Sequence, residues 1–259
     1  MIKIKGVNGF TLGEVLITIA ILGVVSALAI PSFTANVHNQ ANASRLSPIT
    51  SDLENVFGSM LLKEDKDNIF ETAFGTAWVA GNAANIKTAF ESYTKITKSG
   101  TDAINDFGYK QLGVSSNAPV TSLLIPKVFA KDTPNSVATF FLRNINGTQS
   151  GLTFDVALGI PNGAVIFFSD NGHTVFIDVN GSSMPNTYGR DVFAFALGED
   201  GHLYPYGTVR AAELLSASNP TVQTWDNTSA GNDCRCVGTG YDGFGCTARL
   251  IEHNYKVDY

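Results

Sequence analysis

The sequence predicts an α+β fold, in which one long N-terminal helix packs on an antiparallel sheet of three to four strands and a helical insertion separates the helix from the sheet. Three observations predict this fold. Residues 10–30 are almost entirely apolar, residues 46–61 carry apolar side chains at helical spacing, and strand-like apolar segments begin near residue 163. Beyond the apolar segment, roughly 200 residues remain, which is enough for one globular head.

The composition indicates that part of the apolar surface must be hidden. The chain has 259 residues, of which 44% are apolar and only 15% are charged. Such a balance is poor in charge for a soluble surface and favours burial in lipid or in an assembly. The net charge is −6 and the sequence pI is near 5.1. The basic residues do not cluster, so no nucleic-acid partner is predicted.

The N-terminal segment predicts a membrane helix. Residues 1–9 form a short leader that contains Lys3 and Lys5, and residues 10–30 then carry a single charge, Glu14. About 20 helical residues span about 30 Å, the thickness of a bilayer core. The basic leader stays in the cytoplasm under the positive-inside rule, so the rest of the chain crosses the membrane. We assign residues 10–31 to this helix.

Three simpler interpretations of this segment compete. A buried core helix fits poorly, because the apolar run is long, uninterrupted and N-terminal. A cleaved secretory signal is indicated by Ala27-Leu28-Ala29, which resembles a signal-peptidase site and would release an exported binding protein or enzyme. Glu14 within the apolar run and Pro31 beside the cut weigh against it. A plain membrane anchor explains the length and orientation but not Glu14.

Glu14 is the most informative residue of the segment. A lone carboxylate in a membrane span costs about 2.5–3.5 kcal/mol at mid-bilayer, and it is a functional-site candidate by default. A cut between Gly9 and Phe10 would create an α-amino group one helical turn from Glu14. That cation can neutralise the carboxylate in the same chain or in a packed neighbour, where an unpaired charge is costly. The pattern therefore predicts a register device for helix assembly.

This segment resembles the prepilin cleavage and methylation segment of type IV pilins and type II secretion pseudopilins. The resemblance covers about residues 5–33. It implies cleavage after Gly9 by a membrane-embedded prepilin peptidase, N-methylation of Phe10, recruitment into a filament through Glu14 and a helix bend at Pro31. The residues that carry it are Gly9-Phe10-Thr11-Leu12-Gly13-Glu14 and Pro31.

The resemblance implies a pilin-like structural subunit of a type IV pilus or a type II secretion pseudopilus. Its partners would be other pilin or pseudopilin subunits, the prepilin peptidase, an inner-membrane assembly platform and, before assembly, membrane lipid. It would cross the bacterial inner membrane once, with its head outside the cytoplasm, and then enter a periplasmic or cell-surface filament. The large head favours one alternative, a minor priming or tip subunit with an adhesive or substrate-binding head.

The rest of the chain divides into the second half of the helix, residues 32–64, and the globular head, residues 65–259. Pro31 and Pro48 should bend or loosen the helix. Residues 66–112 read as mainly helical, with a break at Gly81-Asn82. One face of the second half is apolar and forms a stripe that needs cover: Leu46, Ile49, Leu53, Val56, Phe57, Met60 and Leu61.

Four segments of the head are predicted strands: residues 163–169, 174–179, 192–197 and 202–206. Asp170-Asn171-Gly172-His173 predicts a hairpin turn between the first two. We expect an antiparallel meander with one buried face, covered by the apolar stripe of the first helix.

Calcium is a candidate ligand of the loop that follows the second predicted strand. Asp178, Asn180 and Asp191 could each offer a side-chain oxygen to the ion. Their spacing begins like an EF-hand loop, but the twelfth position is Gly189, where that motif needs a bidentate glutamate. Turn chemistry between two strands is the alternative interpretation. No other cofactor is predicted.

The three cysteines lie close together near the C-terminus. In an exported chain, we expect a disulfide from Cys246 to either Cys234 or Cys236. A bond between Cys234 and Cys236 would be strained. A zinc site made of these three cysteines and His253 is the alternative, although the single residue between the first two is shorter than the usual ligand spacing.

No sequence motif predicts an enzyme. The chain lacks a nucleophile elbow, a phosphate-binding loop, a dinucleotide fingerprint and an H-E-x-x-H pair. Its four histidines are scattered along the sequence. We therefore predict no catalytic residues.

Overall fold

The computed structural model describes residues 11–110, 141–147, 149–150, 152–169, 173–215, 225, 234 and 243–259, and within these ranges the side chains of all residues except 28, 30–35, 149 and 150. The chain forms two compact units, Met1–Asn39 and Gln40–Tyr259.

The long N-terminal helix is confirmed. Helix α1 (Leu12–Glu64) has 53 residues and continues through the positions of Pro31 and Pro48. The bend at Pro31 stays a prediction, and its side chain lies outside the described residues. Within the second unit, the predicted stripe is buried, and Val56 and Leu61 lie at its partly buried margin. Its buried members are Leu46, Ile49, Leu53, Phe57 and Met60, each at most 3% exposed.

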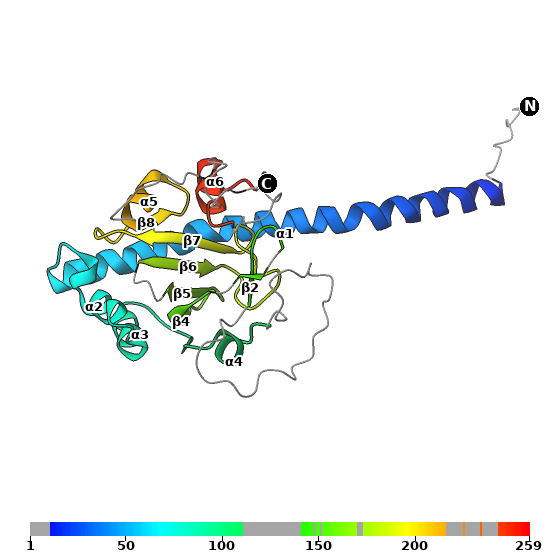
Figure 1. Ribbon diagram of the computed structural model, residues 1–259. Coiled ribbons are helices and arrows are strands. Elements are labelled where there is room, and N and C mark those ends of the chain that lie inside the picture. Colours follow the sequence, from blue (N-terminus) through cyan, green and yellow to red (C-terminus); the bar gives the residue numbers. More distant parts are fainter. Residues whose placement is uncertain are drawn as a thin grey trace, which may run out of the picture. The chain divides into compact units, whose positions relative to one another are not determined.

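The sheet has six antiparallel strands, so the predicted number of three to four is wrong. Its order is β1-β4-β5-β6-β7-β8, and Figure 1 shows the strands from β4 to β8. The four predicted strands correspond to β5 (Val165–Ser169), β6 (Thr174–Asp178), β7 (Val192–Leu197) and β8 (Leu203–Pro205). The sequence analysis missed β4 (Phe154–Gly159) and β1 (Lys98–Gly100). The three residues of β1 carry no apolar pattern, and this segment is a strand only because it pairs with β4.

Both faces of the sheet are buried, whereas one buried face was predicted. Phe168, Ile177 and Phe195 share a hydrophobic cluster with the stripe of α1. On the opposite face, Phe167 and Phe176 pack in a second cluster with Tyr109, Phe141 and Tyr188. Large side chains alternate to both sides of β5 and β6, so each face needs its own cover.

The second face is covered by α4 (Ala103–Phe107) and by residues near a short hairpin of β2 (Leu142–Arg143) and β3 (Gln149–Ser150). A parallel bridge between Arg143 and Thr187 joins this hairpin to the loop after β6. The sequence left residues 137–145 open between a short helix and a strand; in the described part of this segment, Leu142–Arg143 is a strand, and Phe141 and Leu142 form part of the cover.

Helices follow α1 as predicted, although the edge strand β1 of the sheet lies between the last two of them. The insertion contains the 3₁₀ helix η1 (Ile69–Glu71), α2 (Ala73–Val79), α3 (Ala83–Glu91) and α4. Polar side chains cap each helix: Asn68, Thr72, Asn82 and Asp102 accept backbone hydrogen bonds at the N-termini. Gly81 has a φ of 63° at the predicted break between α2 and α3.

Aromatic rings join the insertion to α1 and the sheet. Phe74 lies 5.5 Å from Phe57 of α1 and 5.3 Å from Phe168 of β5, measured between ring centroids. Phe90 and Trp78 lie 5.2 Å from the same Phe168 ring. Two helices of the insertion, α2 and α3, therefore pack on one side chain of the central sheet, and Phe74 connects them to α1.

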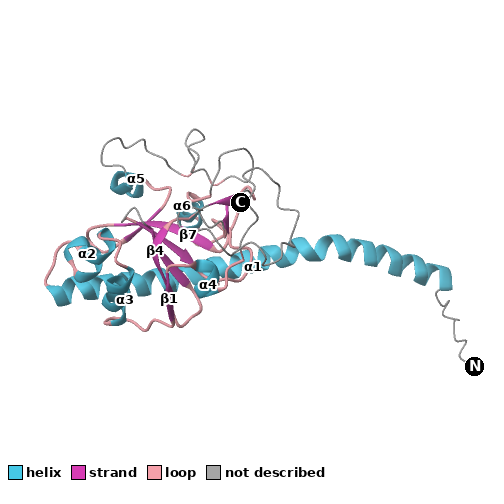
Figure 2. Cartoon of the chain, turned by 60° about the horizontal axis from the view of Figure 1, so that its bottom comes forward, coloured by secondary structure: helices cyan, strands magenta, loops and turns pink. Residues whose placement is uncertain are grey.

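The outer edge of β8 is closed. The backbone N–H of Leu203 donates to Glu54 Oε1 of α1 at 3.0 Å, and Pro205 has no N–H to offer. Such an edge is a poor template for pairing with another strand. Beyond β8 lie α5 (Val209–Leu215) and α6 (Cys246–Glu252), and Figure 2 shows α6 close to β7.

We expect Phe168→Ala to lower the free energy of unfolding of the second unit by about 3–5 kcal/mol, because it opens a cavity among the three aromatic rings of Phe74, Trp78 and Phe90. Chemical denaturation followed by tryptophan fluorescence measures it, since Trp78 contacts Phe168. Leu62→Ala is the control: Leu62 is 83% exposed, and its removal should change the stability by at most about 0.5 kcal/mol. Equal effects of the two variants would contradict the packing described.

Candidate functional site

The N-terminal end of α1 forms a reciprocal cap around Glu14. The carboxylate Oε2 accepts the backbone N–H of Thr11 at 2.8 Å and the Thr11 hydroxyl at 2.9 Å. In return, the Glu14 backbone N–H donates to Thr11 Oγ1 at 3.3 Å. This is a capping box, which satisfies otherwise orphaned donors at the start of a helix. The sequence analysis missed the role of Thr11, although the spacing T-x-x-E signals it.

Of the residues predicted to act in maturation and assembly, Glu14 is exposed at the first turn of α1. Gly9 and Phe10, the residues of the predicted cleavage and N-methylation, lie outside the described residues. The capping box gives Glu14 a local role that does not depend on any partner.

Beyond the cap, the first unit exposes large apolar side chains on every side of its helix. Their exposed fractions range from 41% at Val15 to 78% at Leu12. A helix that is apolar all round needs cover from outside itself. The exposed set in the described part of this unit is Leu12, Val15, Leu16, Ile17, Ile19, Ile21, Leu22, Val24, Val25 and Val37.

Among the described residues, no helix has both the length and the apolar character needed to cross a membrane. The predicted span, residues 10–31, also includes residues 10, 28, 30 and 31, which lie outside the described residues and side chains.

In the second unit, the structure brings together the three candidate calcium ligands at the loop between β6 and β7. Asp178 and Asp191 are both fully buried. Asn180 joins them: its backbone N–H donates to Asp178 Oδ1 at 3.1 Å and its side-chain Nδ2 donates to Asp191 Oδ2 at 3.3 Å. Tyr109, which follows α4, donates its hydroxyl to Asp178 Oδ2 at 2.7 Å.

Asp191 holds the C-terminal part of the same loop through hydrogen bonds. Its two oxygens accept the backbone N–H groups of Asn186 at 2.8 Å and of Thr187 at 2.7 Å. The loop is thereby closed on itself by neutral donors. The sequence analysis did not find Tyr109 as a partner of Asp178, because the two residues are far apart in the chain.

Burial governs the ionisation of this cluster. Burial, and then the nearby charge of Asp191, raise the pKa of Asp178 well above its ordinary value. Burial also raises the pKa of Asp191, to about 6, although hydrogen bonds from Thr187, Asn186 and Asn180 oppose the shift. The pKa of Tyr109 is raised by burial and by the charges of Asp178 and Asp191. Protons therefore stay on the carboxylate pair at a higher pH than on exposed carboxylates.

The hydrogen bonds of the candidate calcium ligands favour a turn-forming role over calcium binding. The carboxylate oxygens already accept hydrogen bonds from the protein, while the side-chain oxygen of Asn180 is buried without a partner. In the described ranges, no three His, Cys, Asp or Glu side chains group closely enough to hold a metal ion. The contacts do not test calcium binding itself, and we expect turn chemistry to be the role of these residues.

Cys234 and Cys246 form a disulfide, one of the two pairings that the sequence left open. Cys236 lies outside the described residues. With both sulfurs joined, Cys234 and Cys246 do not offer the thiolates that zinc requires. His253, the fourth ligand of that alternative, instead places Nδ1 2.6 Å from Asp258 Oδ2.

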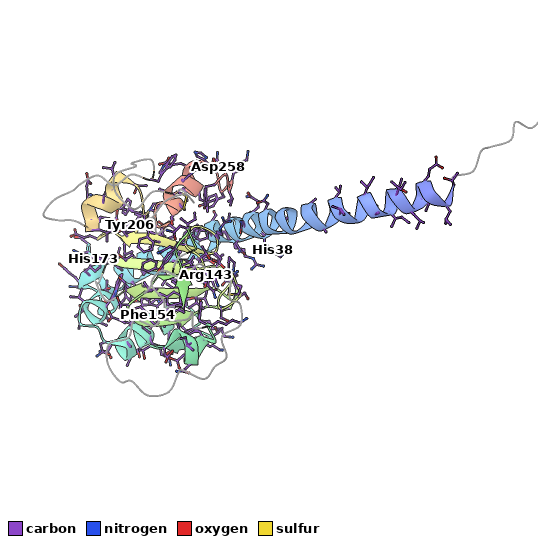
Figure 3. All side chains as sticks on the ribbon, turned by 45° about the vertical axis from the view of Figure 1, so that its right-hand side comes forward. His38, Arg143, Phe154, His173, Tyr206 and Asp258 are labelled. Carbon is purple, nitrogen blue, oxygen red and sulfur yellow. A yellow bond between two sulfur atoms is a disulfide. The ribbon has the colours of Figure 1, made fainter. Side chains whose placement is uncertain are left out.

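The described histidines of the second unit lie apart. His173 packs its ring 4.8 Å from that of Phe70, and Figure 3 shows it far from the labelled Asp258 that contacts His253. His202 Nδ1 lies 3.4 Å from Glu54 Oε1. Each contact joins parts of the fold.

Comparison with known proteins returned no match to a family model, to a curated protein or to a solved structure.

We expect the stability of the second unit to fall as the pH rises from about 4 to 7. The folded-state pKa of Asp191, about 6, lies above its ordinary value of 3.8, so the folded state binds the proton more tightly. This contribution is complete below the ordinary pKa and is lost as the pH rises through about 6. Thermal unfolding of the full-length chain at a series of pH values measures it.

Asp191→Asn should make that pH dependence less steep, whatever it does to the absolute stability, because one of the two titrating carboxyl groups is gone and only Asp178 remains. Asp52→Asn, at an exposed position of α1, is the matched control and should leave the slope unchanged. An unaltered slope in Asp191→Asn would contradict the assignment of the titration to this cluster.

Calcium should leave the melting temperature unchanged, because the loop is already closed by its own hydrogen bonds. A calcium titration of the full-length chain, with magnesium as the control ion, tests this expectation. An upward shift that is specific to calcium and is lost in Asp178→Asn would instead establish the cation site.

Proposed function

We propose that the chain is a structural subunit of a type IV pilus or a type II secretion pseudopilus, assembled through its N-terminal helix after removal of residues 1–9. The observation that carries the proposal is the contrast between the two halves of α1. In residues 12–25 the large apolar side chains are exposed, whereas in residues 46–60 the apolar stripe is buried on the sheet of the same chain.

The exposed half of the helix supports assembly because its apolar surface needs cover from outside the chain. Burying apolar surface is favourable by roughly 25 cal/mol per Å². Contact with either lipid or copies of the same helix would therefore stabilise this exposed half. A subunit that moves from the membrane into a filament contacts lipid first and copies of the same helix afterwards.

Glu14 supports a specific register between such helices. Its carboxylate sits at the first turn of an otherwise apolar helix, held by Thr11 of its own chain. An α-amino group created between Gly9 and Phe10 would bring a cation to the same level. In an apolar bundle, the pairing of that amine with Glu14 of a neighbour is favoured over any register that leaves a charge unpaired.

The second unit fits the head of such a subunit. Its sheet packs on the stripe of α1, and an exported protein is consistent with the disulfide between Cys234 and Cys246. Placement in the bacterial inner membrane before assembly, cleavage by a prepilin peptidase, N-methylation of Phe10 and docking on an inner-membrane platform belong to the same proposal.

The size of the second unit favours one variant of this function. It spans Gln40–Tyr259 and carries the helices α2, α3 and α4 between α1 and the main strands. Such a head suits a minor subunit at the tip or in priming, with an adhesive or substrate-binding role. Labelling filaments with an antibody against the head would distinguish a tip position from a position along the whole shaft.

The decisive experiment compares Glu14→Gln with Glu14→Ala in cells that assemble the filament. Glutamine can still accept the hydrogen bonds of the capping box but carries no charge. If Glu14 pairs with a terminal amine, both variants should lose at least about 90% of the protein in the sheared filament fraction, because an unpaired ammonium remains buried.

The control measures maturation. N-terminal sequencing of the wild type and both variants should give a methylated Phe10, which shows that the loss arises after cleavage. Normal filaments from Glu14→Gln would leave Glu14 with only its capping role and contradict the proposed assembly. A mature N-terminus at Ile30 would point instead to a released, exported binding protein or enzyme.

A further inference from the structure

The last seven residues of the chain, 253–259, lie against three separate elements of the second unit. We call these residues the C-terminal strap. They follow α6 and return toward α1, and Figure 1 shows the C-terminus beside α6. Tyr255 and Val257 pack at the margin of the main hydrophobic cluster, and Tyr259 packs against the cluster that contains the disulfide.

The first attachment is to Gln40 of α1. Gln40 Nε2 donates to the backbone oxygen of Tyr255 at 2.6 Å, and the backbone N–H of Val257 donates to Gln40 Oε1 at 3.2 Å. One side-chain amide thus pairs with two backbone groups two residues apart, as a neighbouring β-strand would. Gln40 is also the first residue of the second compact unit.

The second attachment is to α6. Arg249 Nε donates to Asp258 Oδ1 at 2.9 Å, and Arg249 Nη2 donates to the backbone oxygen of Asp258 at 3.3 Å. His253 Nδ1 lies 2.6 Å from the other oxygen of the same carboxylate. Arg249 Nη1 also donates to the backbone oxygen of Cys234, so the strap and the disulfide share one guanidinium.

The third attachment is to the loop between β6 and β7. The hydroxyl of Tyr259 donates to the backbone oxygen of Gly189 at 2.5 Å. The disulfide lies directly beneath: a Cβ on Gly189 would lie 2.6 Å from Cβ of Cys246. The end of the strap therefore rests on a position where only glycine fits.

The strap begins with a chain reversal in which two residues adopt backbone angles that are uncommon for residues other than glycine. Asn254 and Tyr255 have φ values of 53° and 60°, in the left-handed region that disfavours side chains with a Cβ. The backbone N–H of Tyr255 donates to the oxygen of Leu250 at 2.8 Å, and the attachments at Gln40, Arg249 and Gly189 add to this bond in maintaining the conformation. Strain at one end and polar attachments along the rest are the features of a segment that can open as a unit.

We propose that the C-terminal strap is a clasp that determines where α1 becomes part of the second unit. With the strap closed, the helix is held from Gln40 onward. With the strap open, the first side chains that anchor the helix in the main cluster are Ala43 and Leu46, so residues 40–42 lose their attachment while the sheet stays intact. The inference does not depend on the proposed function.

Hydrogen exchange of the full-length chain, measured by mass spectrometry, tests the proposal with the variant Gln40→Ala. Two hydrogen bonds to the strap are lost, so exchange in residues 40–46 and 255–259 should become about tenfold faster, with β5, β6 and β7 unchanged. Alanine has a higher helix propensity than glutamine, which alone would slow exchange in α1. Faster exchange therefore reports the lost clasp.

Asn55→Ala is the matched control, because it replaces an exposed amide of the same helix within the second unit. It should leave exchange in both segments unchanged. Tyr259→Phe removes only the hydroxyl bond to Gly189 and should speed exchange in residues 255–259 while the disulfide stays formed.

Two outcomes would overturn the proposal. Unchanged exchange in residues 40–46 of Gln40→Ala would show that the strap does not hold the helix. An equal acceleration in β5, β6 and β7 would show a general loss of stability rather than the opening of a clasp.

Discussion

The packing of the α1 stripe on the sheet is the contact on which the second unit depends. Leu46, Leu53 and Phe57 come from the N-terminal quarter of the chain, and their partners Phe168 and Phe195 come from its second half. The contact therefore closes the fold over a long stretch of sequence. The aromatic rings of the insertion gather around the same point, since Phe74 touches both Phe57 and Phe168. The same helix also caps the edge of the sheet, because Glu54 accepts a hydrogen bond from the backbone N–H of Leu203.

At its other end, the same helix has apolar surface and a charge that the described part of the chain leaves without cover or a counter-charge. In the first unit, its large apolar side chains are exposed, and its one carboxylate is held at the start by a capping box with Thr11. The capping box explains how Glu14 is accommodated in a single chain. It does not supply a cation, so in apolar surroundings the charge still needs a partner. This difference between local satisfaction and charge compensation is why the proposed function centres on association rather than on catalysis.

Polar chemistry in the second unit serves mainly to hold loops and ends in place. Asp178 and Asp191 are buried carboxylates whose hydrogen bonds come from Tyr109 and from the loop itself, and burial makes them retain protons at unusually high pH. Arg249 joins the C-terminal strap to the carbonyl of Cys234, beside the disulfide. The carboxylate pair and the Arg249 contacts hold the chain where it reverses without regular secondary structure. Both link segments that lie far apart in sequence.

The sequence by itself determined the features that depend on local periodicity. The stripe from Leu46 to Met60 and the apolar segments of β5, β6 and β7 lie in a helix and strands as predicted, and most of the apolar run of residues 10–30 lies in helix α1. Only the tertiary structure decided the two extra strands, the second buried face, the partner of Asp178 and the attachment of the C-terminal strap to Gln40. The physical reason is that β1 has no pattern of its own, and Tyr109 and Gln40 gain their roles from partners 69 and 215 residues away. Contacts of that range leave no periodic trace in the sequence, because they depend on how the completed elements pack.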